Sequence, residues 1–196
     1  ALCDKVISRH GGLIGIGDPV RAGAVEAVRR LKERGVESVM LTGDNTRTAH
    51  AVAARIGLDR VLAEVLPADK AGEVQRLRGQ GRVVAMVGDG VNDAPALAAA
   101  DVGIAMGSGT DVAMHTAGVT LMQSDPRVVA DAIDISKATS DRIRWNLFWA
   151  FAYNILAIPA AALGFLTPVI AGAAMAMSSV SVVTSSLMLK RWKPER

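Results

Sequence analysis

Two short segments combine acidic, amide and small residues in an order that suits phosphate chemistry. They are Thr42-Gly43-Asp44-Asn45 and Gly88-Asp89-Gly90-Val91-Asn92-Asp93-Ala94-Pro95. The second holds two carboxylates and an amide close together, which suits Mg²⁺, an ion that takes a few carboxylates and completes its octahedron with waters and phosphate oxygens. The glycines let the backbone approach a phosphate closely. Together these residues predict a magnesium and phosphate site.

A lysine in a third segment, Pro67-Ala68-Asp69-Lys70, opens a helix-like stretch. Its ammonium can neutralise phosphate charge. Either glycine-aspartate turn taken alone is more often an ordinary turn with a helix cap. The three segments each follow a strand-like run, and this ordered set favours the phosphate site over three unrelated turns.

The elements that must position these residues alternate between short apolar runs and amphipathic stretches, as parallel βα units do. The strand-like runs cover 13–16, 36–41, 61–65, 83–87, 102–105 and 119–122. The helix-like stretches cover 21–34, 46–56, 70–78, 94–100 and 110–117. Ligands of such sheets bind at the carboxyl ends of the strands, where the three polar segments stand.

These motifs resemble those of the P-type ATPases, and specifically their haloacid dehalogenase-like phosphorylation domain. The matching segments are Asp18-Pro19-Val20-Arg21, the three polar segments above with Ala96-Leu97 continuing the last, and 100–113. The resemblance implies an α/β fold: the C-terminal part of a Rossmann-like parallel-sheet phosphorylation domain, followed by a two-helix transmembrane hairpin.

By this resemblance, each polar residue of the three segments has an expected role. Asp89 and Asp93 would bind Mg²⁺, and Asn92 would shape the metal and phosphate site. The phosphoryl oxygens would be held by Thr42 and Lys70, with Gly43 and Asp44 in the same site. Asp18 would sit at the hinge toward a nucleotide-binding domain.

The nucleophilic aspartate of the family stands in an Asp-Lys-Thr-Gly-Thr motif, which this sequence lacks. Asp4-Lys5 begins in the same way but continues as Val6-Ile7-Ser8, and we interpret it as a coincidence. We expect ATP to be bound largely by parts outside this sequence. The family strand that bears the nucleophile is central in the sheet, so without it two parallel strands should leave a gap or pair with each other. We therefore expect the chain alone to be poorly stable and inactive.

An uncharged run from 145 to 189 is about twice as long as the roughly 20 residues that one membrane helix needs. Residues 164–168 supply a turn, and Trp145 and Trp149 suit the membrane interface. Arg142 and Arg144 before the run, and basic residues after it, predict that both ends are cytoplasmic. The predicted organisation is a partial phosphorylation domain (1–125), a linking amphipathic helix (126–144), a transmembrane hairpin (145–189) and a basic cytoplasmic tail (190–196). A buried soluble hairpin is the alternative.

Polar and sulfur-containing residues inside the hairpin indicate an ion site, because such groups are costly in a membrane. A soft thioether beside small oxygens, with no carboxylate nearby, favours Cu(I) or Ag(I) over zinc. Small-residue helix packing is an equally good reading of the chemistry. The pattern also resembles the last two helices of copper(I)-exporting ATPases. That match makes four residues candidate ligands of the transported ion: Tyr153, Asn154, Met175 and Ser179.

The resulting hypothesis is part of an ATP-driven pump of the cell membrane that moves a soft metal ion, with Cu(I) favoured, through an aspartyl-phosphate intermediate. Expected cofactors and partners are Mg²⁺, ATP, membrane lipid and a metal ion delivered by a metallochaperone. The net charge of +3 gathers beside the apolar run, so nucleic acid is not an expected partner. The alternatives are a pump for Ag, Zn, Cd or K, a soluble haloacid dehalogenase-like phosphatase, and a membrane-anchored regulatory piece.

Overall fold

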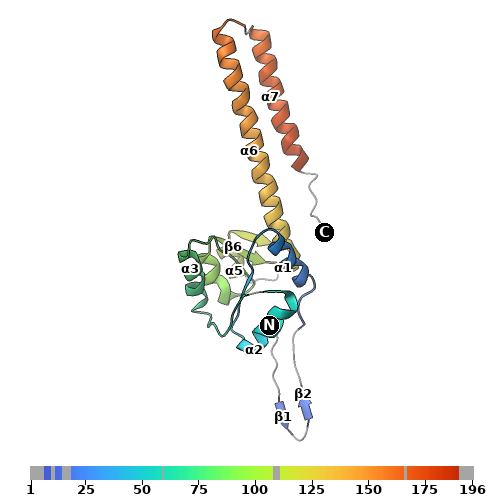
Figure 1. The fold of residues 1–196 in the computed structure, drawn as a ribbon, viewed down its shortest axis with the longest axis vertical. Helices are drawn as coiled ribbons and strands as arrows, with labels where there is room; N and C mark the ends of the chain where they lie inside the picture. Colours follow the sequence, from blue (N-terminus) through green and yellow to red (C-terminus); the bar gives the residue numbers. More distant parts are fainter. Residues whose placement is uncertain are drawn as a thin grey trace. The chain divides into compact units, whose positions relative to one another are not determined.

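The computed structural model describes residues 7–9, 12–14, 19–58, 60–107, 111–165 and 167–189. The chain divides into two compact units, Ala1–Ala130 and Asp131–Arg196. The first unit is mixed α/β and the second is helical (Figure 1).

Two parallel sheets form the centre of the first unit. β3 (Val39–Leu41) pairs with β4 (Arg60–Leu62), and the second sheet has the order β5 (Ala85–Gly88), β6 (Val102–Met106), β7 (Val119–Leu121). These five strands confirm the parallel βα pattern expected from the sequence. No ladder joins the two sheets within the described part of the chain. Of the two arrangements expected when the central family strand is missing, the structure thus has the separated one.

The first predicted strand, at 13–16, belongs to a different kind of pairing. β2 (Gly12–Ile14) pairs antiparallel with β1 (Ile7–Arg9), with Ser8 opposite Leu13. A parallel strand at 13–16 was therefore a wrong expectation. Only two residues separate β1 from β2, whereas a parallel connection needs a dozen or more.

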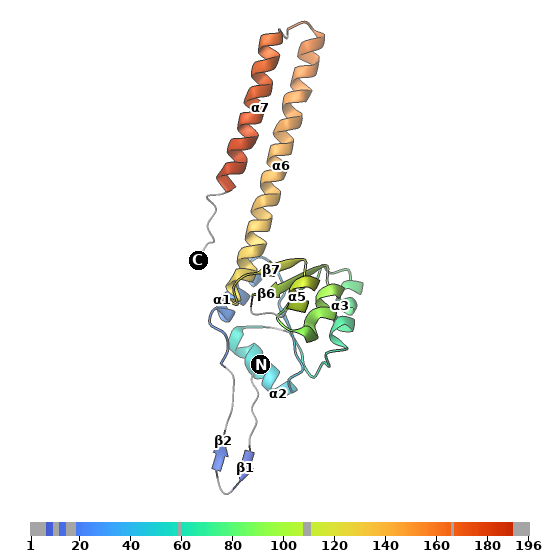
Figure 2. The ribbon, with the colours of Figure 1, turned by 180° about the vertical axis from the view of Figure 1, so that it is seen from behind.

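Five helices of the first unit lie close to the predicted segments. Their bounds are α1 (Ala24–Glu33), α2 (Thr46–Ile56), α3 (Lys70–Gly79), α4 (Ala94–Ala99) and α5 (Asp111–Thr116). The Asn45 side chain accepts from the Thr48 N–H at the start of α2, and Gly57 ends that helix at φ +79°. Helix α2 packs on α1 and β4, while α4 and α5 pack on β6 and α3 packs on α4 (Figure 2).

The packing of α4 against β6 leaves no room for a side chain at position 103, which is a glycine. Leu97, Ala105 and Ala113 form the buried centre of this contact. A Cβ on Gly103 would lie 2.7 Å from the Leu97 carbonyl oxygen. This close approach fixes α4, and with it the short 3₁₀ turn η1 (Val91–Asp93) that precedes it.

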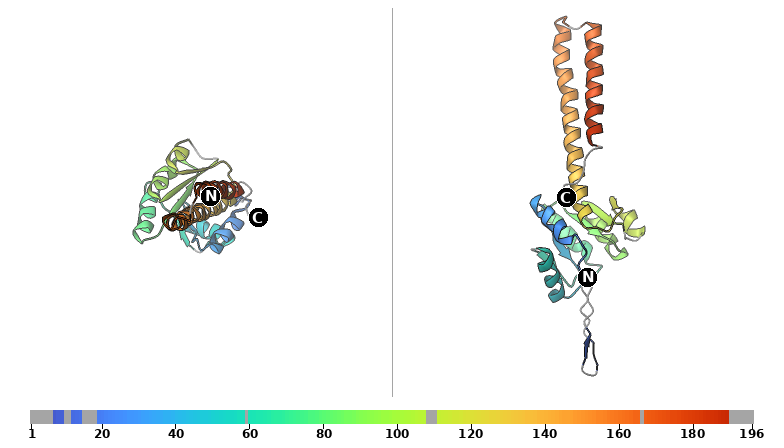
Figure 3. Two further views of the ribbon diagram at one scale, coloured as in Figure 1. Left: turned by 90° about the horizontal axis from the view of Figure 1, so that it is seen from above. Right: turned by 90° about the vertical axis from the view of Figure 1, so that its right-hand side faces the viewer.

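Two long helices follow in the described part of the chain: α6 (Arg127–Ala162) and α7 (Pro168–Leu189). They run side by side (Figure 3). The Asn146 side-chain amide of α6 donates to the Ser186 hydroxyl of α7 at 3.2 Å. Helix α6 is continuous through residue 144, where the sequence suggested a boundary between a linking helix and a membrane helix. Neither Arg142 nor Arg144 breaks a helix, and Pro159 stands in its last turn.

One helix of the described residues is long and apolar enough to cross a membrane by length and composition, over 172–189 in α7. Tryptophan, tyrosine and asparagine lower the hydropathy of the apolar part of α6. The second crossing of the expected hairpin therefore remains a prediction.

Candidate phosphate and metal site

An ion pair joins the segments that follow the two parallel sheets. The Lys70 ammonium lies 2.7 Å from the Asp93 carboxylate, and each side chain is only 15% exposed. Lys70 opens α3 after β4, and Asp93 closes η1 after β5. Because both residues stand beyond the carboxyl ends of their strands, the pair brings the ends of the two sheets to one site.

The turn after β5 is tight around Asp93. A Cβ on buried Gly88 would lie 2.7 Å from the Asp93 Cβ, so only glycine fits there without moving the carboxylate. Asp89 follows and is half exposed. A pocket of about 270 Å³ opens here, lined by Arg21, Val87, Gly88, Asp89, Asp93, Met106, Pro126 and Val129.

The loop after β3 folds on itself. The Thr42 hydroxyl donates to the Asp44 carboxylate at 3.0 Å and accepts from the Asp44 N–H at 3.1 Å. The Val65 N–H donates to the Thr42 carbonyl, and the Glu64 N–H donates to the Asp44 carbonyl. A Cβ on exposed Gly43 would meet the Val65 carbonyl at 3.4 Å. The loop is thus held against residues 64–65, a few residues before Lys70.

Sequence-predicted site residues therefore fall into two neighbouring groups. Lys70 and Asp93 are in contact, and Asp89 shares their pocket, while Asn92 is exposed on η1. Thr42 and Asp44 form a second group, connected to Lys70 through the chain segment 64–70. Asp18 lies outside the described residues.

Two residues near the site carried no role in the sequence analysis. Arg21 was noted only as part of a motif, yet its guanidinium contacts Asp89 at 3.3 Å. Glu64 has φ +57°, in the left-handed region, and its carboxylate accepts from the Thr46 N–H and hydroxyl at the start of α2. Such strain in a non-glycine residue clusters at functional sites. The sequence offers no signal for Glu64, because nothing in its surroundings marks a positive φ.

The carboxylate ligands that line the pocket suit Mg²⁺. Within the described residues no three or more His, Cys, Asp or Glu side chains gather at a single point. A closed protein cage of that kind suits other metals, whereas Mg²⁺ is held by one or two carboxylates plus waters and substrate phosphates. Asp89 and Asp93, facing one open pocket, supply that number of carboxylates.

In the second unit, one of the four candidate ligands lines the groove that the structure describes between residues 142 and 188. Tyr153 lines a groove of about 620 Å³ beside α7, whereas Met175 is 73% exposed and outside the lining. The Asn154 amide donates to the Ala150 carbonyl and the Ser179 hydroxyl to the Met175 carbonyl, so both polar groups are satisfied by their own helix. Ser179 and Met175 lie one turn apart on α7.

Family models decide the broad assignment of the first unit. The model of haloacid dehalogenase-like hydrolases matches residues 2–101, and a second model of the same description matches residues 74–133. The chain belongs to the haloacid dehalogenase-like hydrolase family. The two matched ranges together contain both parallel sheets.

Among curated proteins, this haloacid dehalogenase-like chain is similar to copper-exporting P-type ATPases. It is 56% identical over 182 residues to that of Bacillus subtilis (strain 168), covering 93% of this chain and 23% of the relative. It is 54% identical over 184 residues to that of Staphylococcus aureus (strain bovine RF122 / ET3-1), covering 94% and 23%. The chain thus spans about a quarter of the length of these relatives.

Among solved structures, it is similar to a zinc-transporting PIB-type ATPase in the E2.Pi state. The TM-score is 0.82 at 40% identity, covering 94% of this chain and 31% of that one. It is also similar to the catalytic domain of the CPx-ATPase CopB-B, with a TM-score of 0.53 at 30% identity over 62% of this chain and 47% of that one.

Proposed function

We propose that this chain is part of a P-type ATPase that moves Cu(I) across a membrane, driven by ATP through an aspartyl-phosphate intermediate. The observation that carries the proposal is the Lys70–Asp93 ion pair, with Asp89 on the same pocket, at the carboxyl ends of two parallel sheets. The nucleophilic aspartate and most of the nucleotide site would come from parts of the protein outside this sequence.

Phosphoryl transfer to a carboxylate brings negative groups together, so the site must supply positive charge. Lys70 supplies one such charge from the start of α3. Mg²⁺, held by Asp89 and Asp93, would offset the charge of the transferred phosphoryl group. The close pairing of Lys70 with Asp93 would keep the ammonium oriented until phosphate oxygens bind to it.

Thr42 and Asn92 are the proposed hydrogen-bond donors to the phosphoryl oxygens, with Gly43 and Asp44 shaping the loop. The Thr42 hydroxyl donates to Asp44 at 3.0 Å and turns toward phosphate by rotation about one bond. Asn92 is exposed and its amide is accessible to a ligand.

Copper as the transported ion is supported by the 56% identity to a copper-exporting relative and by the soft thioether of Met175. Met175 is 73% exposed on α7, so its face is accessible to a further ligand from another helix. Zinc is the second candidate, because a zinc-transporting ATPase resembles this chain with a TM-score of 0.82. Tyr153, Asn154 and Ser179 complete the proposed ion-binding set.

A membrane location follows from this proposal. Helix α7 is apolar enough to cross, and we assign the second crossing to the uncharged part of α6, whose large apolar side chains are exposed. Both ends of the hairpin would face the cytoplasm.

The test is Mg²⁺-dependent phosphorylation of the intact protein that carries this sequence. Asp89→Asn should abolish phosphoenzyme formation from radiolabelled ATP, because a neutral amide binds Mg²⁺ weakly. The matched control is Asp141→Asn, an exposed carboxylate outside the pocket, which should leave phosphorylation unchanged. Normal phosphoenzyme levels in the Asp89 variant would refute the assignment.

A further inference from the structure

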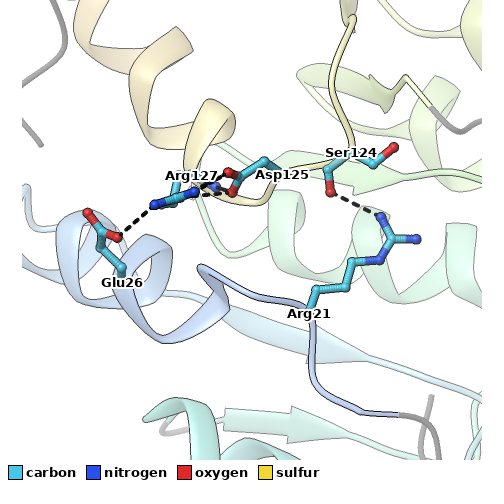
Figure 4. A network of polar contacts seen from close by, with 5 residues as sticks. All are labelled: Arg21, Glu26, Ser124, Asp125 and Arg127. Atoms are coloured by element: carbon cyan, nitrogen blue, oxygen red, sulfur yellow. Dashed lines mark hydrogen bonds and ion pairs between the residues drawn. The ribbon is translucent and has the colours of Figure 1, made fainter.

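Arg21 connects the metal-binding side of the pocket to the chain that leads into α6. One terminal nitrogen of its guanidinium lies 3.3 Å from the Asp89 carboxylate. The other donates to the Ser124 carbonyl at 3.1 Å (Figure 4). The two partners are 68 and 103 residues away in sequence, so one side chain ties together three distant segments.

The segment that carries Arg21 is pressed against the start of α6. Gly23 has φ +85°, and a Cβ there would lie 2.8 Å from Arg127 Nε and 2.9 Å from Asp125 Oδ1. Arg127 in turn pairs with Asp125 at 2.6 Å and with Glu26 of α1 at 3.5 Å (Figure 4). A shift of the Arg21 segment therefore displaces the groups that hold the first turn of α6.

The ion pair between Arg21 and Asp89 is weak enough for another cation to replace Arg21. Both side chains are about half exposed, at 51% and 50%, and such ion pairs contribute little to stability. A divalent cation that binds the Asp89 carboxylate can therefore displace the guanidinium at little cost in stability.

We propose that Arg21 is the resident countercharge of Asp89, and that a divalent cation binding to Asp89 displaces the guanidinium and loosens the link to Ser124. This inference rests on the proposed function for the role of Asp89 as a Mg²⁺ ligand. Arg21 is then a positioning residue: it competes with the metal, and it transmits metal occupancy to the loop before α6. Such coupling is reciprocal, so anything that fixes the loop weakens metal binding.

The first measurement is calorimetric titration of Mg²⁺ into the intact protein without nucleotide. Arg21→Gln should bind Mg²⁺ about two- to fivefold more tightly than the unmodified protein, since the displaced ion pair is a weak, exposed one. Arg21→Lys keeps a competing charge and should stay close to the unmodified protein. Arg29→Gln is the matched control, because Arg29 pairs with Glu33 on the surface of α1 and should not change the affinity.

The second measurement is hydrogen–deuterium exchange of the peptide over 119–128. In the unmodified protein, Mg²⁺ should speed exchange in this peptide, because the link to Ser124 is released. In Arg21→Gln the exchange should be fast already and insensitive to Mg²⁺.

The outcomes separate this inference from the proposed function. If Asp89→Asn loses Mg²⁺ binding but Arg21→Gln binds Mg²⁺ as the unmodified protein does, or less tightly, the countercharge role of Arg21 is refuted while the metal site stands. The countercharge role is also refuted if Mg²⁺ does not change hydrogen–deuterium exchange of the 119–128 peptide in the unmodified protein. If Asp89→Asn binds Mg²⁺ normally, both the metal site and the role of Arg21 are refuted.

Discussion

The Lys70 ammonium and the Asp93 carboxylate are 2.7 Å apart and largely shielded from water, at 15% exposure each. Lys70 follows one parallel sheet and Asp93 follows the other. No strand ladder joins those sheets in the described residues, and this pair is one contact between their carboxyl ends. Its energy should therefore matter for stability as well as for chemistry.

A double-mutant cycle measures that energy. Lys70→Met leaves a partly buried carboxylate without its partner, and should cost about 1–3 kcal/mol of unfolding free energy. Asp93→Asn removes the same interaction from the other side. The double variant should lose less than the sum of the two, by about 0.5–3 kcal/mol, as expected for residues in contact. Chemical denaturation of the three variants checks this, and strict additivity would show that the pair contributes nothing to stability.

Substitution of glycine by alanine tests the close packing that positions η1. Gly103→Ala should destabilise the protein by about 1–3 kcal/mol, because the added methyl would lie 2.7 Å from the Leu97 carbonyl oxygen. Gly72→Ala is the matched control, since Gly72 lies inside α3 with open space around it and should be neutral or stabilising by about 0.5–1 kcal/mol. Denaturation midpoints that fall equally in both variants would contradict the packing argument.

The surroundings of Asp101 predict that part of the stability of the protein is lost at low pH. A hydrogen bond from the Val84 N–H, together with the Arg78 guanidinium, holds the pKa of Asp101 below its usual value of 3.8. A carboxyl with a lowered folded-state pKa stabilises the protein above its unfolded-state pKa, and that contribution is lost as the pH falls through the folded-state pKa.

The melting temperature of Asp101→Asn should therefore lie below that of the unmodified protein at pH 6, and the two should converge as the pH falls toward 3. Asp141→Asn, at an exposed site on α6, serves as the control. A difference that stays constant from pH 6 to pH 3 would show that charge at Asp101 is not the cause.

The orientation of α6 and α7 can be read by thiol labelling in membranes. In the intact protein with Cys3 and every other cysteine replaced by serine, Leu163→Cys at the turn between the helices should react with an impermeant thiol reagent only from the outside of cells. Asp141→Cys should react only in inside-out vesicles, because the proposed hairpin places both of its ends in the cytoplasm. Labelling of both positions from the same side would rule out two crossings.

Much of the first unit follows from local pattern. Each of the strands β3 to β7 contains a valine and precedes turn residues, so their positions could be predicted from the sequence. The antiparallel pairing of β1 with β2 was not predicted, because an apolar run does not by itself show whether its partner strand is parallel or antiparallel. The sequence placed a domain boundary at 144–145, and α6 runs through it because a change in composition does not by itself end a helix.

The site was predictable in its residue types but not in its contacts. Lys70 and Asp93 were both expected there because each follows a strand, yet their direct pairing across 23 residues is a product of the fold. The Arg21–Asp89 contact spans 68 residues, and no spacing rule relates the two positions. The strain at Glu64 depends on how residues 64–65 meet the Thr42 loop, which is again a tertiary property.

The most direct test of the account is ATP-dependent metal uptake by inside-out vesicles that contain the intact protein. The account predicts uptake of Cu(I), its loss in Asp89→Asn, and strongly reduced uptake in Met175→Leu, which preserves volume but removes the soft sulfur ligand. Uptake of Zn²⁺ without Cu(I), or Cu(I) uptake that persists in Asp89→Asn, would contradict it.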